Sequence, residues 1–102
     1  MTDRELLEKA AKAAGYEPAT FEGRNVGWYL PSEGVGPWNP LTDDGDALRL
    51  AVKLNLQVTI SPCYCDAYSP DHDIDVSENN ADTYAATRRA IVRAAAAIGE
   101  SL

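Results

Sequence analysis

The sequence has few of the side chains that most often bind metals or act as nucleophiles. Among 102 residues there are one histidine, His72, and two cysteines, Cys63 and Cys65. A structural zinc site usually takes four such ligands, so a nearby aspartate would have to complete one here. A disulfide between cysteines two apart in a strand would be distorted. We therefore expect reduced thiols and no cofactor, with metal binding or thiol catalysis at these three residues as minor alternatives.

Long apolar runs and an excess of positive charge are also absent. No run approaches the roughly 20 residues of a membrane span, and the N-terminal residues lack the charged-then-apolar order of a signal peptide. The net charge is −7, from 16 acidic and 9 basic residues. This disfavours direct nucleic-acid binding through phosphate contacts. No phosphate-binding loop, dinucleotide fingerprint or nucleophile elbow occurs. The sequence predicts a cytoplasmic protein that does not enter a membrane.

Three segments have the apolar spacing of helices, near residues 3–14, 43–54 and 82–98. Thr2 is in position to cap the first helix. Asn55 can adopt the left-handed conformation that ends the second. The third segment is rich in alanine, which predicts close packing onto a sheet.

The remaining segments predict short strands. Residues 20–30 are expected to form a hairpin that turns near residues 23–25, and residues 31–40 a loop rich in glycine and proline. Three further strands are expected between residues 56 and 76. Their buried positions are predicted at Leu56, Val58, Ile60, Ile74 and Val76. The result is one α+β domain over residues 1–102. It has a mainly antiparallel sheet of three to five strands with helices packed on it, an α/β/α sandwich in the order α-ββ-α-βββ-α.

The stretch "PWNPLTDDGDALRL" places three aspartates around Gly45. A calcium loop of the EF-hand type needs a glutamate at its twelfth position, but counting from Asp43 reaches Leu54. Asp43 or Thr42 can instead cap the second helix, and the other aspartates then lie in its first turn, where the helix dipole favours negative charge. We interpret the stretch as a helix start, with a hard-cation site that uses Asp43 or Asp46 and distant partners as the alternative.

Three of the nine basic residues, Arg88, Arg89 and Arg93, lie within six positions of the last predicted helix. None has an acidic residue three or four positions away in that helix. Six acidic residues lie between Lys53 and Arg88 and could pair with them. Otherwise the arginines are candidates for binding an anion, together with an aromatic side chain. The aromatic candidates are Trp38, Trp28 and Tyr84.

Two segments, "WNPLTDDGDALRLAVKLNL" and "AATRRAIVRAAAAI", resemble a family of small proteins from tailed bacteriophages and prophages, the phage ABA-sandwich domain. With compatible regions in the first helix and central strands, the resemblance covers most of the chain. It implies a helix–sheet–helix sandwich and a phage protein that acts in the bacterial cytoplasm. It implies no activity, cofactor or catalytic residue.

We therefore expect a non-enzymatic phage accessory protein that binds a host or phage protein. The candidate surfaces are the loop at Trp38 with the start of the second helix, and the arginine face of the last helix. The alternative is a protein that sequesters a small anionic ligand, such as a nucleotide signal, through Arg88, Arg89 or Arg93. The sequence leaves homo-oligomerisation open.

Overall fold

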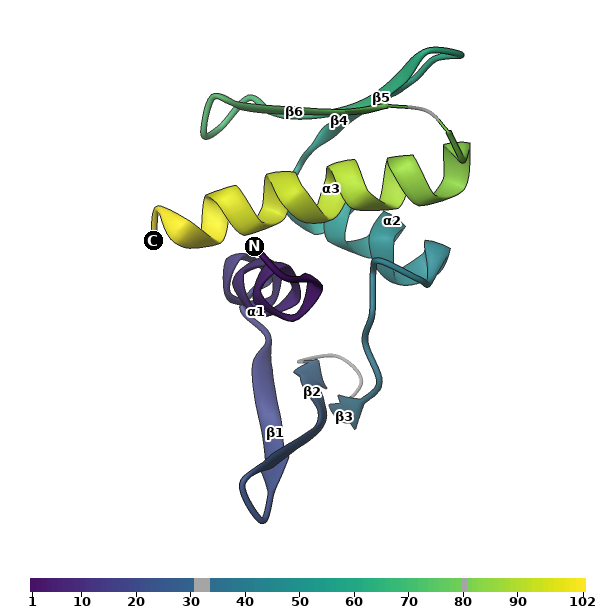
Figure 1. The fold of residues 1–102 in the computed structure, drawn as a ribbon. Coiled ribbons are helices and arrows are strands. Elements are labelled where there is room, and N and C mark those ends of the chain that lie inside the picture. The colour runs from purple at the N-terminus through teal and green to yellow at the C-terminus, as the bar shows by residue number, and fades with distance from the viewer. Residues whose placement is uncertain (31–33, 80) are drawn as a thin grey trace.

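The described residues form three helices and two three-stranded antiparallel sheets in the computed structural model (Figure 1), which describes residues 1–30, 34–79 and 81–102. The elements in chain order are α1 (Asp3–Ala14), β1 (Glu17–Phe21), β2 (Arg24–Leu30), β3 (Gly34–Gly36), α2 (Asp44–Lys53), β4 (Gln57–Ile60), β5 (Tyr64–Ser69), β6 (Ile74–Asn79) and α3 (Thr83–Glu100).

Helix α3 is the central element. The sheet of β4, β5 and β6 covers one side of it, and α1 and α2 lie on the other side (Figure 1). The sheet of β1, β2 and β3 extends away from the helices and gives the molecule its long axis, with extents of 44 × 27 × 26 Å (Figure 1). The predicted α+β fold with helices packed on an antiparallel sheet is thus confirmed. Its layers differ from the expected α/β/α order, because the strands divide into two sheets and α3 occupies the middle.

The first two helices start at predicted capping residues, and the third starts at a capping aspartate. The Thr2 side chain accepts a hydrogen bond from the backbone N–H of Glu5, 3.2 Å away, and Asp43 and Asp82 cap α2 and α3 in the same way. Gly15 ends α1 with a φ of 80°, a conformation that costs glycine little. Local sequence therefore determines where the helices begin.

The predicted hairpin is present, with its turn one residue earlier than expected. Phe21 pairs with Arg24, so the turn residues are Glu22 and Gly23, with φ of 53° and 79°. Positive φ at both positions is typical of the type I′ turn that joins twisted strands. The prediction that residues 31–40 form a loop is wrong in part, because Gly34–Gly36 pairs with β2 as a third strand. Residues 31–33 of that loop lie outside the described residues.

The second sheet has the predicted strands, but its first strand is more exposed than expected. Ile74 and Val76 of β6 pack against the core, as predicted. In β4, Val58 and Ile60 lie opposite Ala67 and Cys65, which are buried against α3. Val58 and Ile60 themselves are exposed, because β4 is an edge strand that lies beside the gap between α2 and α3.

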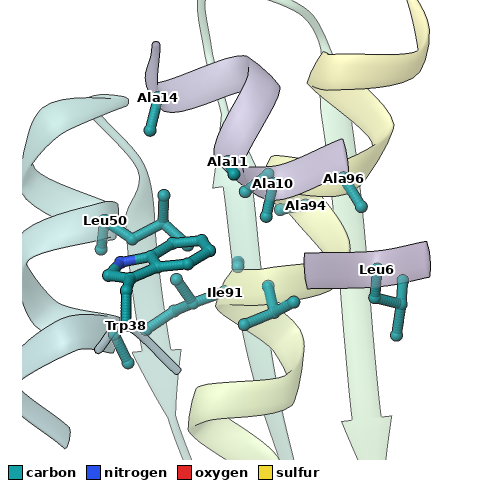
Figure 2. Packing of buried hydrophobic residues seen from close by; sticks show 14 of the residues in the cluster. Leu6, Ala10, Ala11, Ala14, Trp38, Leu50, Ile91, Ala94 and Ala96 are labelled. Carbon is teal, nitrogen blue, oxygen red and sulfur yellow. The ribbon is translucent and has the colours of Figure 1, made fainter. Parts of the chain in front are cut away.

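The core lies where the three helices meet. Figure 2 shows alanines of α1 facing alanines of α3, with Leu50 of α2 and Trp38 in the same cluster. These small side chains let α1 approach α3 closely, and Gly99 lies directly against the backbone of Lys9.

Within the described residues, no helix combines the length and apolar character that a bilayer crossing requires.

Candidate functional site

An apolar groove runs between α2, β4 and the first turns of α3. Its volume is about 570 Å³. Most of the lining is apolar, and the lining residues are Asp44, Ala47, Leu48, Ala51, Val58, Ile60, Thr83, Tyr84, Thr87, Arg88 and Ile91. The groove exists because α3 covers β5 and β6 more fully than β4, which leaves the inner face of β4 without a full covering helix.

Large apolar side chains stand at the mouth of this groove rather than in its depth. Leu48 is 64% exposed, Ile60 60% and Tyr84 71%. Val52 is also exposed and lies one helical turn after Leu48, hence on the same side of α2. A contiguous exposed apolar patch on a small protein is typical of a surface that contacts another molecule.

One side of the groove ends at an ion pair between α2 and α3. Arg88 donates from Nη1 to Oδ1 of Asp44, 2.6 Å away, and from Nε to the carbonyl oxygen of Leu41, 2.8 Å away. Its side chain is mostly buried, whereas the Asp44 side chain is exposed. Arg88 thereby ties α3 to the segment before α2, and its charge is neutralised where it borders the groove.

The aspartates at the start of α2 each have a structural partner. Oδ2 of Asp43 accepts from the backbone N–H of Asp46 at 2.8 Å, the contact of a helix cap. Asp46 accepts from the backbone N–H of Asn39 at 2.9 Å and from Arg49 at 2.7 Å. Asp44 binds Arg88. No group of three potential metal ligands occurs among the described residues, and these contacts account for the whole acidic stretch as a helix start.

We predict that Asp43→Ala lowers the free energy of unfolding by about 0.5–2 kcal/mol, because it removes the cap of α2. Urea denaturation measures this loss. Thr42→Ala is the matched control. Among the described residues the Thr42 hydroxyl has one hydrogen-bond contact, the Asn39 carbonyl oxygen at 3.4 Å, so its loss should change little. Equal losses in the two variants would show that Asp43 is not the cap.

The arginines of α3 do not form one site. Arg88 borders the groove, whereas Arg89 and Arg93 line a separate hollow of about 420 Å³ between α1, β6 and α3. Glu78 binds both of the latter, at 3.2 Å from Arg89 and 2.7 Å from Arg93. Arg89 also donates to Asp3 at 3.1 Å. The helix of these two arginines offers them no acidic partner three or four positions away, and β6 and α1 supply their acidic partners instead.

Trp38 is a core residue rather than a ligand-contacting one. Its side chain is 5% exposed and packs edge-on against the rings of Tyr16 and Trp28, with centroids 5.4 and 5.6 Å away. The proposal that Trp38 contacts a ligand therefore needs correction, because its indole has almost no surface to offer. Trp28 is buried as well, and only Tyr84 of the three candidate aromatics is exposed.

The cysteines and the histidine lie in different surroundings. Cys63 is exposed before β5, whereas Cys65 is buried beneath α3, with Sγ 3.2 Å from the Thr87 hydroxyl. His72 lies in the turn at the far end of β5, where Nδ1 is 3.1 Å from Oγ of Ser69. The Ser69 Oγ also accepts from the backbone N–H of His72, which is a turn-stabilising contact. The three residues therefore do not converge on one site.

Two carboxylates lie together on the outer face of the second sheet. Asp66 of β5 accepts a 2.7 Å hydrogen bond from Ser77, and Asp75 of β6 is its neighbour. A hydrogen bond with Asp66 raises the pKa of Asp75, and desolvation and the Asp66 charge raise it further. The folded state therefore holds this proton more strongly than the unfolded state does. Stability should fall as the pH rises from the ordinary value of 3.8 through the raised pKa.

We predict that Asp75→Asn raises the melting temperature at neutral pH, because it removes the repulsion between the two carboxylates. The variant should also lose part of the rise in stability that the parent protein shows on mild acidification. Asp71→Asn, in the exposed β5–β6 turn, removes the same charge without this contact and is the control. Thermal melts of all three proteins over the acidic range measure the difference. If the melting temperatures of the parent protein and Asp75→Asn depended on pH in the same way, the contact between Asp66 and Asp75 would be contradicted.

The comparisons with known proteins add no relative: no family model, no curated protein and no solved structure matches the chain. The site is thus defined by geometry alone. The groove was not predicted from the sequence, although Leu48 and Val52 carried a signal. They are apolar residues that widen the apolar face of α2 beyond what one packing contact can cover.

Proposed function

We propose that this protein is a non-catalytic binding module of a bacteriophage or prophage, which acts in the bacterial cytoplasm by occupying a surface of a host or phage protein. The phage origin is supported by the resemblance of residues 38–56 and 85–98 to the phage ABA-sandwich family. The α+β class, with helices on an antiparallel sheet, agrees with that resemblance, whereas the order of the layers differs from a helix–sheet–helix sandwich.

The observation that carries the binding role is the groove between α2, β4 and α3. Its exposed Leu48, Ile60 and Tyr84 offer apolar and aromatic contacts of the kind that form the centre of protein interfaces. Its charged residues, Asp44 and Arg88, already neutralise each other. Such a lining favours an apolar protein segment over a charged substrate.

A photo-crosslinking experiment in bacteria tests this role. A photoreactive phenylalanine analogue at Leu48 should yield a covalent adduct of one defined mass. The same analogue at Val26, exposed on the first sheet, should yield none. Adding Ile60→Lys should abolish the Leu48 adduct, because a lysine would place a charge in the contact. If the Leu48 and Val26 positions behave alike, the groove does not bind a protein.

The alternative function is sequestration of a small anionic ligand. Its supporting observation is the hollow that Arg89 and Arg93 line. Against it stands Glu78, which already binds both guanidinium groups. A nucleotide that displaced Glu78 should raise the melting temperature, by mass action on the folded state. A panel of mono-, di- and cyclic nucleotides tests this. If no nucleotide raises the melting temperature of a protein that still crosslinks at Leu48, the sequestration role is refuted and the binding-module role remains.

A further inference from the structure

The four edges of the two sheets differ in how they are protected against pairing with another strand. β1 contains Pro18 and a register shift between Ala19 and Thr20. β3 has only three residues, and β6 carries Asp75 and Glu78. Proline, irregular register, shortness and charge each block edge pairing. β4, with the sequence QVTI, is also short at four residues. It has no proline, no charged residue and no register shift.

The free edge of β4 also adjoins the apolar groove. No other described strand pairs with β4 on the side away from β5, so alternate residues direct backbone N–H and C=O groups outward. Val58 and Ile60 point toward the helices, opposite Ala67 and Cys65, whereas Gln57 and Thr59 point away. The edge and the groove together fit an uncharged extended segment whose alternate side chains are apolar.

We propose that this segment is β4 of a second copy of the chain. The inference rests on the proposed binding role and names the partner. Two β4 strands pair antiparallel about a two-fold axis perpendicular to the sheet and form one sheet of six strands. β4 is itself a segment of the kind that its edge and the groove fit, since it is uncharged and carries apolar side chains on one face only. Because this edge lacks charge, it also avoids local repulsion between chains of net charge −7.

The two faces determine the register of this pairing. Directly opposite residues in antiparallel strands point to the same face, so the two apolar faces coincide only when residues of equal parity pair. Placing Thr59 opposite Thr59 of the second copy puts Val58 opposite Ile60 of that copy. Leu48 of α2, which lines the groove and is exposed, then approaches the same axis and is covered.

Sedimentation velocity on the purified protein tests the proposal. The parent chain should sediment with a mass of about 22 kDa, twice the 11.0 kDa of one chain. Ile60→Lys should raise the dimer dissociation constant by roughly tenfold or more, which is about 1.4 kcal/mol or more. Val26→Lys is the control, since Val26 and Ile60 are both 60% exposed. A monomer at high concentration overturns the proposal, as does dissociation by Val26→Lys instead of Ile60→Lys.

A cysteine crosslink tests the register. In a Cys63→Ser background, Thr59→Cys should form a covalent dimer on mild oxidation, because closely paired antiparallel residues have Cα atoms within the range of a disulfide. Thr20→Cys on exposed β1 should not. Failure of Thr59→Cys to crosslink overturns this register. The two proposals fail separately. If the Leu48 analogue crosslinks to a different protein and never to a second copy of the chain, the self-pairing is refuted and the binding role stands. If it yields no adduct at all, the binding role is refuted.

Discussion

Replacing Gly99 with alanine should remove a large part of the folding free energy. A Cβ atom built on Gly99 would lie 2.0 Å from the carbonyl oxygen of Lys9 and 2.9 Å from its carbonyl carbon. Both atoms belong to the backbone of α1, so no side-chain rotation can relieve the overlap. The two helices would have to move apart at this contact.

Two opposing effects determine the size of this loss. Alanine is favoured over glycine inside a helix by about 1 kcal/mol. Overpacking a tight contact costs about 1–3 kcal/mol, and more where the surroundings cannot move. The movement would also loosen the alanine contacts between α1 and α3. The upper end of the overpacking cost less the helix gain leaves about 2 kcal/mol, and the loosened contacts add to it. We therefore expect a net loss of about 2 kcal/mol or more, a large share of the stability of about 5–15 kcal/mol typical of a domain.

Urea denaturation of Gly99→Ala measures this loss, with Gly45→Ala as the control. Gly45 also lies in a helix, but its nearest neighbours are ends of the Arg49 and Asp43 side chains, 3.2–3.3 Å away. The Arg49 side chain can move aside, and the Asp43 carboxylate has to shift by only a few tenths of an ångström, which keeps its capping hydrogen bond. The control should therefore lose little. If Gly99→Ala is as stable as Gly45→Ala, then α1 and α3 are not in contact at this point.

The alanine-rich sequence of α3 illustrates what local pattern can and cannot predict. Composition indicated close packing, and the structure has it. The predicted packing was against a sheet alone, whereas α3 packs against a sheet on one side and against α1 on the other. A helix with small residues on several faces can have close neighbours on each of them. Which neighbour lies on which face depends on contacts far apart in the sequence.

The candidate site shows the same limit. The capping role of Asp43 was predictable because its partner lies three residues away. The pairing of Arg89 and Arg93 with Glu78 was predictable only as one option, since a 15-residue separation from Arg93 says nothing about geometry. Leu48 and Val52 indicated that the apolar face of α2 is wider than one contact covers, but the groove itself was not predictable, because it requires β4 to be an edge strand and α2 to lie beside it. Neither condition can be read from local periodicity.

Trp38→Ala should cost about 3–5 kcal/mol of folding free energy, the usual range for truncating a buried tryptophan. Its indole packs edge-on against Tyr16, just after α1, and against Trp28 of β2. Edge-on aromatic pairs add about 0.5–1.5 kcal/mol each beyond the area that they bury. Figure 2 shows Trp38 in one cluster with Leu50 of α2 and Ile91 of α3, so one side chain joins the first sheet to the helices.

This position predicts a local effect as well as a global one. In Trp38→Ala, amide hydrogen exchange should accelerate most in β1 and β2, because their sheet loses its attachment to the helices. Trp38→Phe should recover part of the loss, since it keeps an aromatic ring in the cluster. Tyr29→Ala is the control on the same strand as Trp28: Tyr29 is half exposed, and surface substitutions usually change stability by less than about 0.5 kcal/mol. If Trp38→Ala instead left stability intact and abolished binding of a partner, Trp38 would be a contact residue rather than a core residue.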